Sequence, residues 1–346
     1  MPQYRFVVAP APHTMEIRSG EVPAPAPDGV VVDVTYCGIC ATDTHGYTTG
    51  GLPPAVFGHE WAGTVAAVGA EVEHLAVGQR VVACVGPACG ACPQCVAGHT
   101  ANCDVAFAEA NGVTADSPSH GGFATSIAVP ARRVLPVLDS LSDEQAALVE
   151  PAAVTFHAVK RVRQQLGAVV VVQGAGPIGL LTAQHARHAG AGRVIVVEPN
   201  EARRDAARRL GFTEVLEPGE AFTRYVFDSS AGLGADVLYE CTGAAGLFQA
   251  SAELVRRGGT LALLGFPMES SEVSYPDWQQ RELTVIGSLA YNHEDFVGAM
   301  RAIASGAVDV EVLHTGTIGL DGLEAMFQEL DAGSSRHAKV LVDPRR

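Results

Sequence analysis

The chain has 346 residues, of which 47% are hydrophobic and 18% are charged, with a formal net charge of −15. This length favours two domains, and the acidic balance argues against binding to nucleic-acid phosphates through bulk electrostatics. Glycine and proline interrupt every apolar stretch before it reaches membrane-spanning length. Eight cysteines without a secretion signal indicate a reducing compartment, so we expect a cytoplasmic protein.

The first part of the chain is expected to be rich in β-structure. Short runs of β-branched residues occupy 30–36, 63–69 and 79–85, and glycine or proline separates them. No helical period of useful length precedes about residue 142. This pattern predicts an antiparallel, barrel-like domain that carries loops.

Four cysteines follow one of these runs with the spacing Cys-x2-Cys-x2-Cys-x7-Cys. Thiolates this close in sequence can surround a tetrahedral Zn²⁺, and the glycines and prolines between them let the loop turn back on the ion. Four protein ligands leave no open coordination position, so the predicted zinc is structural. Disulfides and free thiols are the alternatives. The lobe is expected over 86–104, with the ligands Cys89, Cys92, Cys95 and Cys103.

A second group of cysteine, histidine and carboxylate side chains lies nearby. Open zinc sites take three protein ligands of these kinds and leave one position for water or substrate. Cys40 and His59 are candidates, with Glu60 or Glu150 as the carboxylate. Taken singly, His59 could be a hydrogen-bonded core histidine, Glu60 a surface charge and Cys40 a small buried apolar residue. Cys37 could also form a disulfide with Cys40 or bind metal beside it.

From about residue 168 the pattern changes to strands alternating with helices, which predicts a parallel sheet. A helix near 294–304 and a strand at 337–343 could return to the first domain. The remaining strands are expected at 168–174, 193–198, 236–243, 260–265 and 284–288, with helices at 177–190, 201–211 and near 246–256.

A glycine motif follows the first of these strands and opens a helix. In that context G-x-G-x-x-G predicts a dinucleotide site with the pyrophosphate at the helix N-terminus. Glu198 ends the next strand, where a carboxylate accepts the ribose hydroxyls of NAD and repels the 2′-phosphate of NADP. Arg203 could pair with that phosphate, which keeps NADP open as the less favoured cofactor. The motif consists of Gly174, Ala175, Gly176, Pro177, Ile178 and Gly179.

Together these motifs resemble those of the zinc-dependent medium-chain dehydrogenases and reductases, the alcohol dehydrogenase superfamily. The resemblance covers essentially the whole length and is closest to the polyol branch, with sorbitol and butanediol dehydrogenases. It implies an α/β plus β fold, with a GroES-like β-barrel catalytic domain over 1–152, a Rossmann NAD-binding domain over 153–292 and a return to the catalytic domain over 293–346. It rests on CGICATDTHG, GHEWAGTVAAVG, the four-cysteine lobe, VEPAAVTFHAV, QGAGPIGLL and HAKVLV.

The resemblance also implies which residues bind the catalytic zinc. Cys40 matches the zinc thiolate, and Cys37 matches a non-ligand. His59 matches the zinc histidine. Glu150 stands where the polyol enzymes have a glutamate, and Glu60 matches a carboxylate that either binds the zinc or lies close beside it.

Roles in proton transfer and cofactor binding follow from the same resemblance. Thr42 matches the hydroxyl that receives the alcohol proton, and His45 matches the relay residue beyond it. Asp43 matches a carboxylate that orients the zinc histidine. Lys339 is similar to a basic residue that reaches the cofactor pyrophosphate. Further cofactor contacts are expected at Thr242, Leu264, Gly265, Ser288 and Leu289.

The implied function is zinc-dependent transfer of hydride between a secondary alcohol, diol or polyol and NAD. Two zinc ions per chain and a homodimer or homotetramer are expected with it. Two alternatives stay open. One is an NADPH-dependent carbonyl or enone reductase of the same fold without a catalytic metal, and the other is a non-enzymatic protein that binds zinc and NAD.

Overall fold

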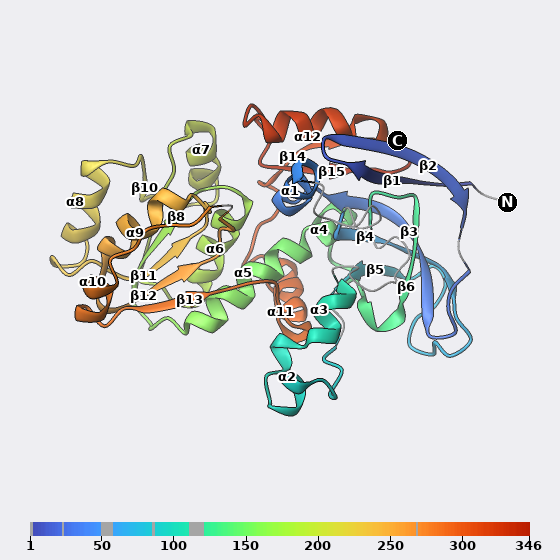
Figure 1. Ribbon diagram of the computed structural model, residues 1–346, viewed down its shortest axis with the longest axis horizontal. Helices are drawn as coiled ribbons and strands as arrows, with labels where there is room; N and C mark the ends of the chain where they lie inside the picture. The colour runs from blue at the N-terminus through green and yellow to red at the C-terminus, as the bar shows by residue number, and fades with distance from the viewer. Residues whose placement is uncertain (1–2, 23, 50–57, 85–86, 111–120, 268) are drawn as a thin grey trace. The chain divides into compact units, whose positions relative to one another are not determined.

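The computed structural model describes residues 3–22, 24–49, 58–84, 87–110, 121–267 and 269–346, so residue 86 of the predicted lobe lies outside it. The chain forms two compact units (Figure 1). No helix within these ranges is both long enough and apolar enough to cross a bilayer. The first unit comprises Met1–Glu150, Tyr291–Met300 and His314–Arg346, and the second comprises Pro151–Ala290 and Arg301–Leu313.

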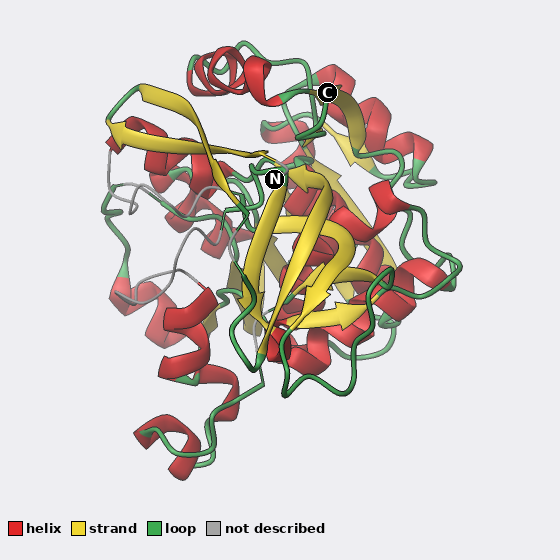
Figure 2. Cartoon of the chain, turned by 90° about the vertical axis from the view of Figure 1, so that its right-hand side faces the viewer, coloured by secondary structure: helices red, strands yellow, loops and turns green. Residues whose placement is uncertain are grey.

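A seven-stranded sheet forms the centre of the first unit (strands in yellow, Figure 2). Its strand order is β14-β15-β3-β4-β5-β7, with β6 paired to β3. Because β3 has partners on both edges and is covered on both faces, its valines are buried in succession rather than alternately. The strands are β3 (Gly29–Gly38), β4 (Glu60–Val68), β5 (Arg80–Ala83), β6 (Ser126–Pro130), β7 (Val134–Pro136), β14 (His314–Ile318) and β15 (Lys339–Val342); β1 (Gln3–Ala11) and β2 (Thr14–Glu21) form a separate ribbon.

Helices also occur in the first part of the chain, where the sequence showed no helical period. The expectation of no useful helix before residue 142 is wrong, because α1 (Ala41–Thr49) precedes it. This helix buries Asp43, Thr44 and Gly46 beside one large side chain, Tyr47, and a single such residue makes no apolar stripe. The other helical segments of the first unit are α2 (Pro93–Val96), η1 (Thr100–Asn102), α3 (Asp104–Ala110), η2 (Ala131–Arg133), α4 (Asp143–Ala147), η4 (Leu320–Gly322) and α12 (Leu323–Asp331). Helix α11 (His293–Ala304) begins in the first unit and ends in the second.

The second unit is a parallel six-stranded sheet with helices on both faces (Figure 1). Its order, β10-β9-β8-β11-β12-β13, is that of a doubly wound dinucleotide-binding sheet, and the order reverses between β8 and β11. The predicted fold class is confirmed. The strands are β8 (Val169–Gln173), β9 (Arg193–Val197), β10 (Val215–Leu216), β11 (Ala235–Glu240), β12 (Val255–Leu263) and β13 (Thr284–Gly287). The helices are α5 (Val149–Val162), α6 (Pro177–His188), α7 (Glu201–Arg209), α8 (Glu220–Asp228), η3 (Ala245–Leu247), α9 (Phe248–Leu254) and α10 (Tyr275–Gln280).

One segment of the predicted return to the catalytic domain, Arg301–Leu313, falls in the second unit instead. Two hydrogen bonds explain this placement. The Gln184 side chain on α6 donates to the Asp309 carbonyl at 3.0 Å and accepts from the Asp309 N–H at 2.7 Å. Residues 314–346 then supply β14, β15 and α12 to the first unit.

Candidate active site

Three of the predicted zinc ligands come together in the first unit. The ligand atoms of Cys40, His59 and Glu60 all lie within 4.8 Å of one another. Cys40 follows β3, and Glu60 begins β4, which pairs with β3. Sulfur, nitrogen and oxygen donors in this number suit an open zinc site, so the residues present fit the ion that the sequence predicted.

The approach of Glu60 to β3 depends on a glycine. Gly38 pairs with Glu60 across the two strands, and a Cβ on Gly38 would collide with the Glu60 carboxylate. The second residue of the CGIC motif therefore provides space for the carboxylate.

Asp43 contacts each part of this cluster except Glu60. Its Oδ2 accepts from the Cys40 N–H at 3.0 Å, and its Oδ1 accepts from the Gly58 N–H at 3.1 Å. The same Oδ1 lies 3.5 Å from His59 Nδ1. Burial alone would lower the pKa of His59, but the Asp43 and Cys40 charges raise it well above its usual value. The site therefore favours a positive charge at the position where a metal would bind.

Lys339, for which a contact with the cofactor pyrophosphate is predicted, is paired with Glu60 in the structure. Its Nζ lies 2.7 and 2.8 Å from the two Glu60 oxygens and 2.9 Å from the Ile39 carbonyl. These three acceptors use all three donors of the ammonium group. Burial alone would lower the pKa of Lys339, but Glu60 raises it above the ordinary value, and the pair stays ionic.

Glu150 lies near this cluster but outside the group of three whose ligand atoms are mutually close. It occupies the first turn of α5. Burial raises its pKa to about 7, while the His59 charge and a hydrogen bond from Tyr291 favour the ionised form. Of the two candidate carboxylates, Glu60 is thus the one beside Cys40 and His59. No motif in the sequence indicated Tyr291 as its hydrogen-bonding partner.

The two predicted relay residues lie on α1. Thr42 is exposed in the first turn, and His45, three residues later, is half-buried. Side chains three residues apart lie on the same face of a helix, so the two polar groups are neighbours.

The four cysteines of the lobe also converge. Their sulfurs all lie within 4.8 Å of one another, with Cys89 and Cys95 at 4.0 Å and Cys92 and Cys103 at 3.9 Å. A disulfide needs about 2.05 Å, whereas zinc–sulfur bonds of about 2.3 Å place tetrahedral sulfurs about 3.8 Å apart.

Backbone N–H groups stabilise thiolates in this lobe. Cys89 and Ala106 donate to the Cys103 sulfur at 3.3 and 3.4 Å. The Cys95 N–H lowers the pKa of Cys92 to about 6, whereas burial raises the pKa of Cys95 to about 12. Donor type and spacing fit one structural zinc.

The predicted nucleotide contacts lie at the carboxyl edge of the second sheet. Gly174 has φ +91° directly after β8, and a Cβ on Gly179 would collide with the Gly174 carbonyl. Open space surrounds Gly176 at the N-terminus of α6, where Pro177 and Ile178 begin the helix. The segments that follow the other strands carry Glu198, Thr242, Leu264, Gly265, Ser288 and Leu289.

Two observations at this edge fit a bound dinucleotide. The Ser288 hydroxyl is buried and has no partner among the described residues, so a polar ligand atom would satisfy it. The Glu198 carboxylate bridges the glycine loop and α7 by accepting from the Ala175 N–H at 2.8 Å and from the Asn200 N–H at 2.9 Å. Arg203 Nη1 lies 4.0 Å from Glu198.

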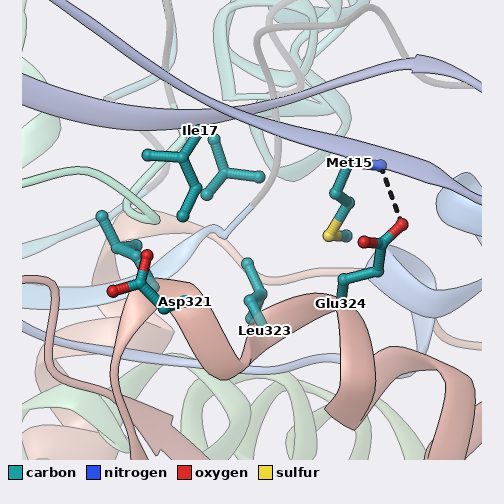
Figure 3. A pocket seen from close by; sticks show the side chains of 7 residues that line it. Met15, Ile17, Asp321, Leu323 and Glu324 are labelled. Carbon is teal, nitrogen blue, oxygen red and sulfur yellow. Dashed lines mark hydrogen bonds between the residues drawn. The ribbon is translucent and has the colours of Figure 1, made fainter.

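A cavity of about 230 Å³ elsewhere in the first unit holds no predicted site residue (Figure 3). Its two carboxylates already have partners. Asp321 pairs with Arg5 at 2.9 Å, and Glu324 accepts from the Met15 N–H at 3.2 Å. The lining residues are Val7, Met15, Ile17, Leu320, Asp321, Leu323 and Glu324.

Two family models match the chain: the alcohol dehydrogenase GroES-like domain at 26–139 and the zinc-binding dehydrogenase at 177–305. Sorbitol dehydrogenase of Bacillus subtilis (strain 168) is 32% identical over 345 residues, which cover 96% of each protein. The chain belongs to the zinc-dependent alcohol dehydrogenase family. The predicted family and the assignment as an oxidoreductase are confirmed.

Other members of the family match this dehydrogenase over nearly the whole length. The probable D-xylulose reductase A of Aspergillus terreus is 34% identical over 330 residues, 91% of each protein. A zinc-binding dehydrogenase of Sinorhizobium meliloti 1021, bound to NADP, has a TM-score of 0.87 and 30% identity, with 99% of this chain and 100% of that one covered. An alcohol dehydrogenase of Escherichia coli CFT073 in complex with NADH has a TM-score of 0.86 and 25% identity, with 99% of each chain covered.

Proposed function

We propose that this dehydrogenase transfers hydride between NAD and a secondary alcohol, diol or polyol, with one catalytic and one structural zinc per chain. The convergence of Cys40, His59 and Glu60 within 4.8 Å carries this proposal. The relatives named for sorbitol and D-xylulose favour a polyol or its ketone as the substrate.

Residues of the first unit have separate roles in metal binding, proton transfer and orientation of the zinc histidine. When held by Cys40, His59 and Glu60, zinc supplies Lewis-acid polarisation of the substrate oxygen. Thr42 takes the hydroxyl proton, and His45 passes it toward solvent. Asp43 orients the His59 ring and fixes the loop that carries Cys40.

NAD is the preferred nucleotide in this proposal. When bound, it supplies the hydride acceptor. Glu198 places a buried carboxylate at the end of β9, and its charge disfavours a 2′-phosphate there. Comparison of kcat/KM for NAD and NADP tests this preference, and a higher value for NADP would contradict it.

The cellular setting and assembly remain part of the proposal. All eight cysteines are free, which suits a reducing compartment such as the cytoplasm. We expect a homodimer or homotetramer, because β13 leaves one edge of the sheet without a partner among the described residues.

The deciding experiment measures NAD reduction across polyols, diols and amino alcohols, together with the zinc content of the same sample. Cys40→Ala should abolish turnover and remove one zinc per chain. The matched variant Cys37→Ala should keep both zinc ions, because Cys37 is buried outside the cluster. The reverse result would overturn the choice of ligand. One zinc in the wild type, with NADPH-dependent carbonyl reduction, would favour the reductase that has no catalytic metal.

A further inference from the structure

Glu240 is a fully buried carboxylate, at 0% exposure, for which the sequence predicts no role. It ends β11 and lies opposite Gln173, the last residue of β8. The strand order of the sheet reverses between these two strands, and dinucleotides bind outside the carboxyl ends at such a reversal. The carboxylate therefore lies beneath the nucleotide crevice.

The side chain of Glu240 holds the turn that follows it. Oε1 accepts from the Thr242 N–H at 2.7 Å and from the Thr242 hydroxyl. The Gly243 N–H lies 3.2 Å from Oε1 and 3.1 Å from Oε2. N–H and O–H donors on Thr242 and Gly243 thus solvate the carboxylate in place of water.

The main chain of Glu240 links this turn to the one after β12. Its carbonyl accepts from the N–H groups of Leu264 and Gly265, each at 2.9 Å. A Cβ on Gly265 would collide with Gly243, so the two turns touch backbone to backbone. On the other side, a Cβ on Gly174 would lie 3.0 Å from Thr242 Cγ2. Glu240 therefore fixes the spacing of three segments that carry predicted nucleotide contacts.

The Thr242 side chain forms hydrogen bonds within this turn. Its hydroxyl donates to Glu240 and accepts from the Ala244 N–H at 3.1 Å. The single O–H donor is consequently used within the protein. A nucleotide would meet the main chain of this turn, whose position depends on Glu240.

On the basis of the proposed function, we propose that Glu240 is a positioning residue for the nucleotide. It touches neither cofactor nor substrate, since a buried negative charge would repel a pyrophosphate at close range. It acts through the turn at 241–244, which it holds against Gly174 and Gly265. The backbones of these three segments then form one continuous binding surface.

Glu240→Gln tests this role, with NADH binding measured directly by fluorescence titration of the zinc-loaded protein. The amide nitrogen of glutamine cannot accept from the Gly243 N–H, so the turn should loosen. We expect the Kd for NADH and the KM for NAD to rise by about tenfold or more, equivalent to one lost charged hydrogen bond. Zinc content and kcat at saturating NAD should stay near the wild-type values.

Asp236→Asn is the matched control, because Asp236 lies at the amino end of the same strand. It accepts from the Val169 N–H at 2.8 Å and from Arg256 Nε at 2.6 Å, far from the carboxyl edge. This variant should lower stability and leave the Kd for NADH unchanged.

An unchanged Kd for NADH in folded Glu240→Gln protein would overturn the role of Glu240. If Glu240→Gln does not fold, Thr242→Val replaces it, since valine removes the hydroxyl donor and keeps the carboxylate. A rise of several-fold in Kd is expected from the loss of that bond, and a wild-type Kd would again overturn the role. Failure of the wild type to bind NADH would instead contradict the proposed function.

Discussion

Lys339 and Glu60 form a buried ion pair that joins residues 279 positions apart in the chain. The side chains are 5% and 1% exposed, so solvent screens neither charge. A sequence motif reports each residue separately and cannot show that they meet. This is why the sequence did not reveal the pairing of Lys339 with the Glu60 carboxylate.

Lys339→Met should destabilise the zinc-free protein strongly, because it leaves the Glu60 carboxylate buried and unpaired. We expect a loss of about 3–5 kcal/mol in the free energy of unfolding, measured by urea denaturation. The loss should be smaller with zinc bound, since the ion can neutralise Glu60. Arg5→Met removes the exposed pair with Asp321 and should cost no more than about 1 kcal/mol. Equal losses in the two variants would contradict this expectation.

His185 gives the second unit a pH-dependent stability. Its ring contacts the Ala152 carbonyl at 3.1 Å, and burial lowers its pKa to about 4. The unfolded chain, with a histidine pKa of about 6.5, binds a proton that the folded chain does not, so stability falls as pH drops from about 6.5 toward about 4.

The loss from His185 should reach about 2 kcal/mol between about pH 7 and about pH 5. Urea unfolding of the wild type and of His185→Gln at both pH values measures it. Glutamine can keep the bond to Ala152 but does not titrate, so its stability should change less with pH. Parallel pH profiles for the two proteins would show that His185 does not titrate in this way.

At the scale of elements, the sequence predicted those helices and strands whose buried residues follow a regular pattern. The unit β8-α6-β9 was predicted because its valines form a continuous buried run and a glycine motif opens the helix. Helix α1 was missed because its buried face combines Asp43, Thr44 and Gly46 with a single large apolar side chain, Tyr47. The metal-ligand motifs were visible locally, whereas the support from Lys339, Tyr291 and Glu240 depends on tertiary contacts.

The four-cysteine lobe should bind its zinc independently of the catalytic centre. Cys95→Ser should remove one of the two zinc ions, because a hydroxyl is a poor substitute for a thiolate ligand. The segment at 87–103 should then become sensitive to protease, while NADH binding persists. Cys241→Ser, in the second unit, should keep both ions. Loss of both zinc ions from Cys95→Ser would show that the two sites depend on each other.

At the scale of the whole molecule, β13 is the feature that bears on assembly. It is the last strand of the six-stranded sheet, and Val285 on it is 39% exposed. Unpaired N–H and C=O groups on such an edge favour pairing with a second copy of the chain.

Val285→Asp should shift the protein toward the monomer in size-exclusion chromatography with light scattering, because it buries a charge in the proposed interface. Val77→Asp is the control, since Val77 is 64% exposed and belongs to the first unit rather than to β13. An oligomer that is unchanged in Val285→Asp would place the subunit contact elsewhere.

The sulfur spacing of the lobe also affects how a purified sample should be handled. Cys89 and Cys95, like Cys92 and Cys103, need to approach by only about 2 Å to form a disulfide. An oxidant can therefore expel the zinc and close the lobe with disulfide bonds in its place. A protein stored in air would then contain one zinc per chain, the same zinc content as a reductase without a catalytic metal. Counting free thiols beside zinc distinguishes an oxidised preparation from a true single-zinc enzyme.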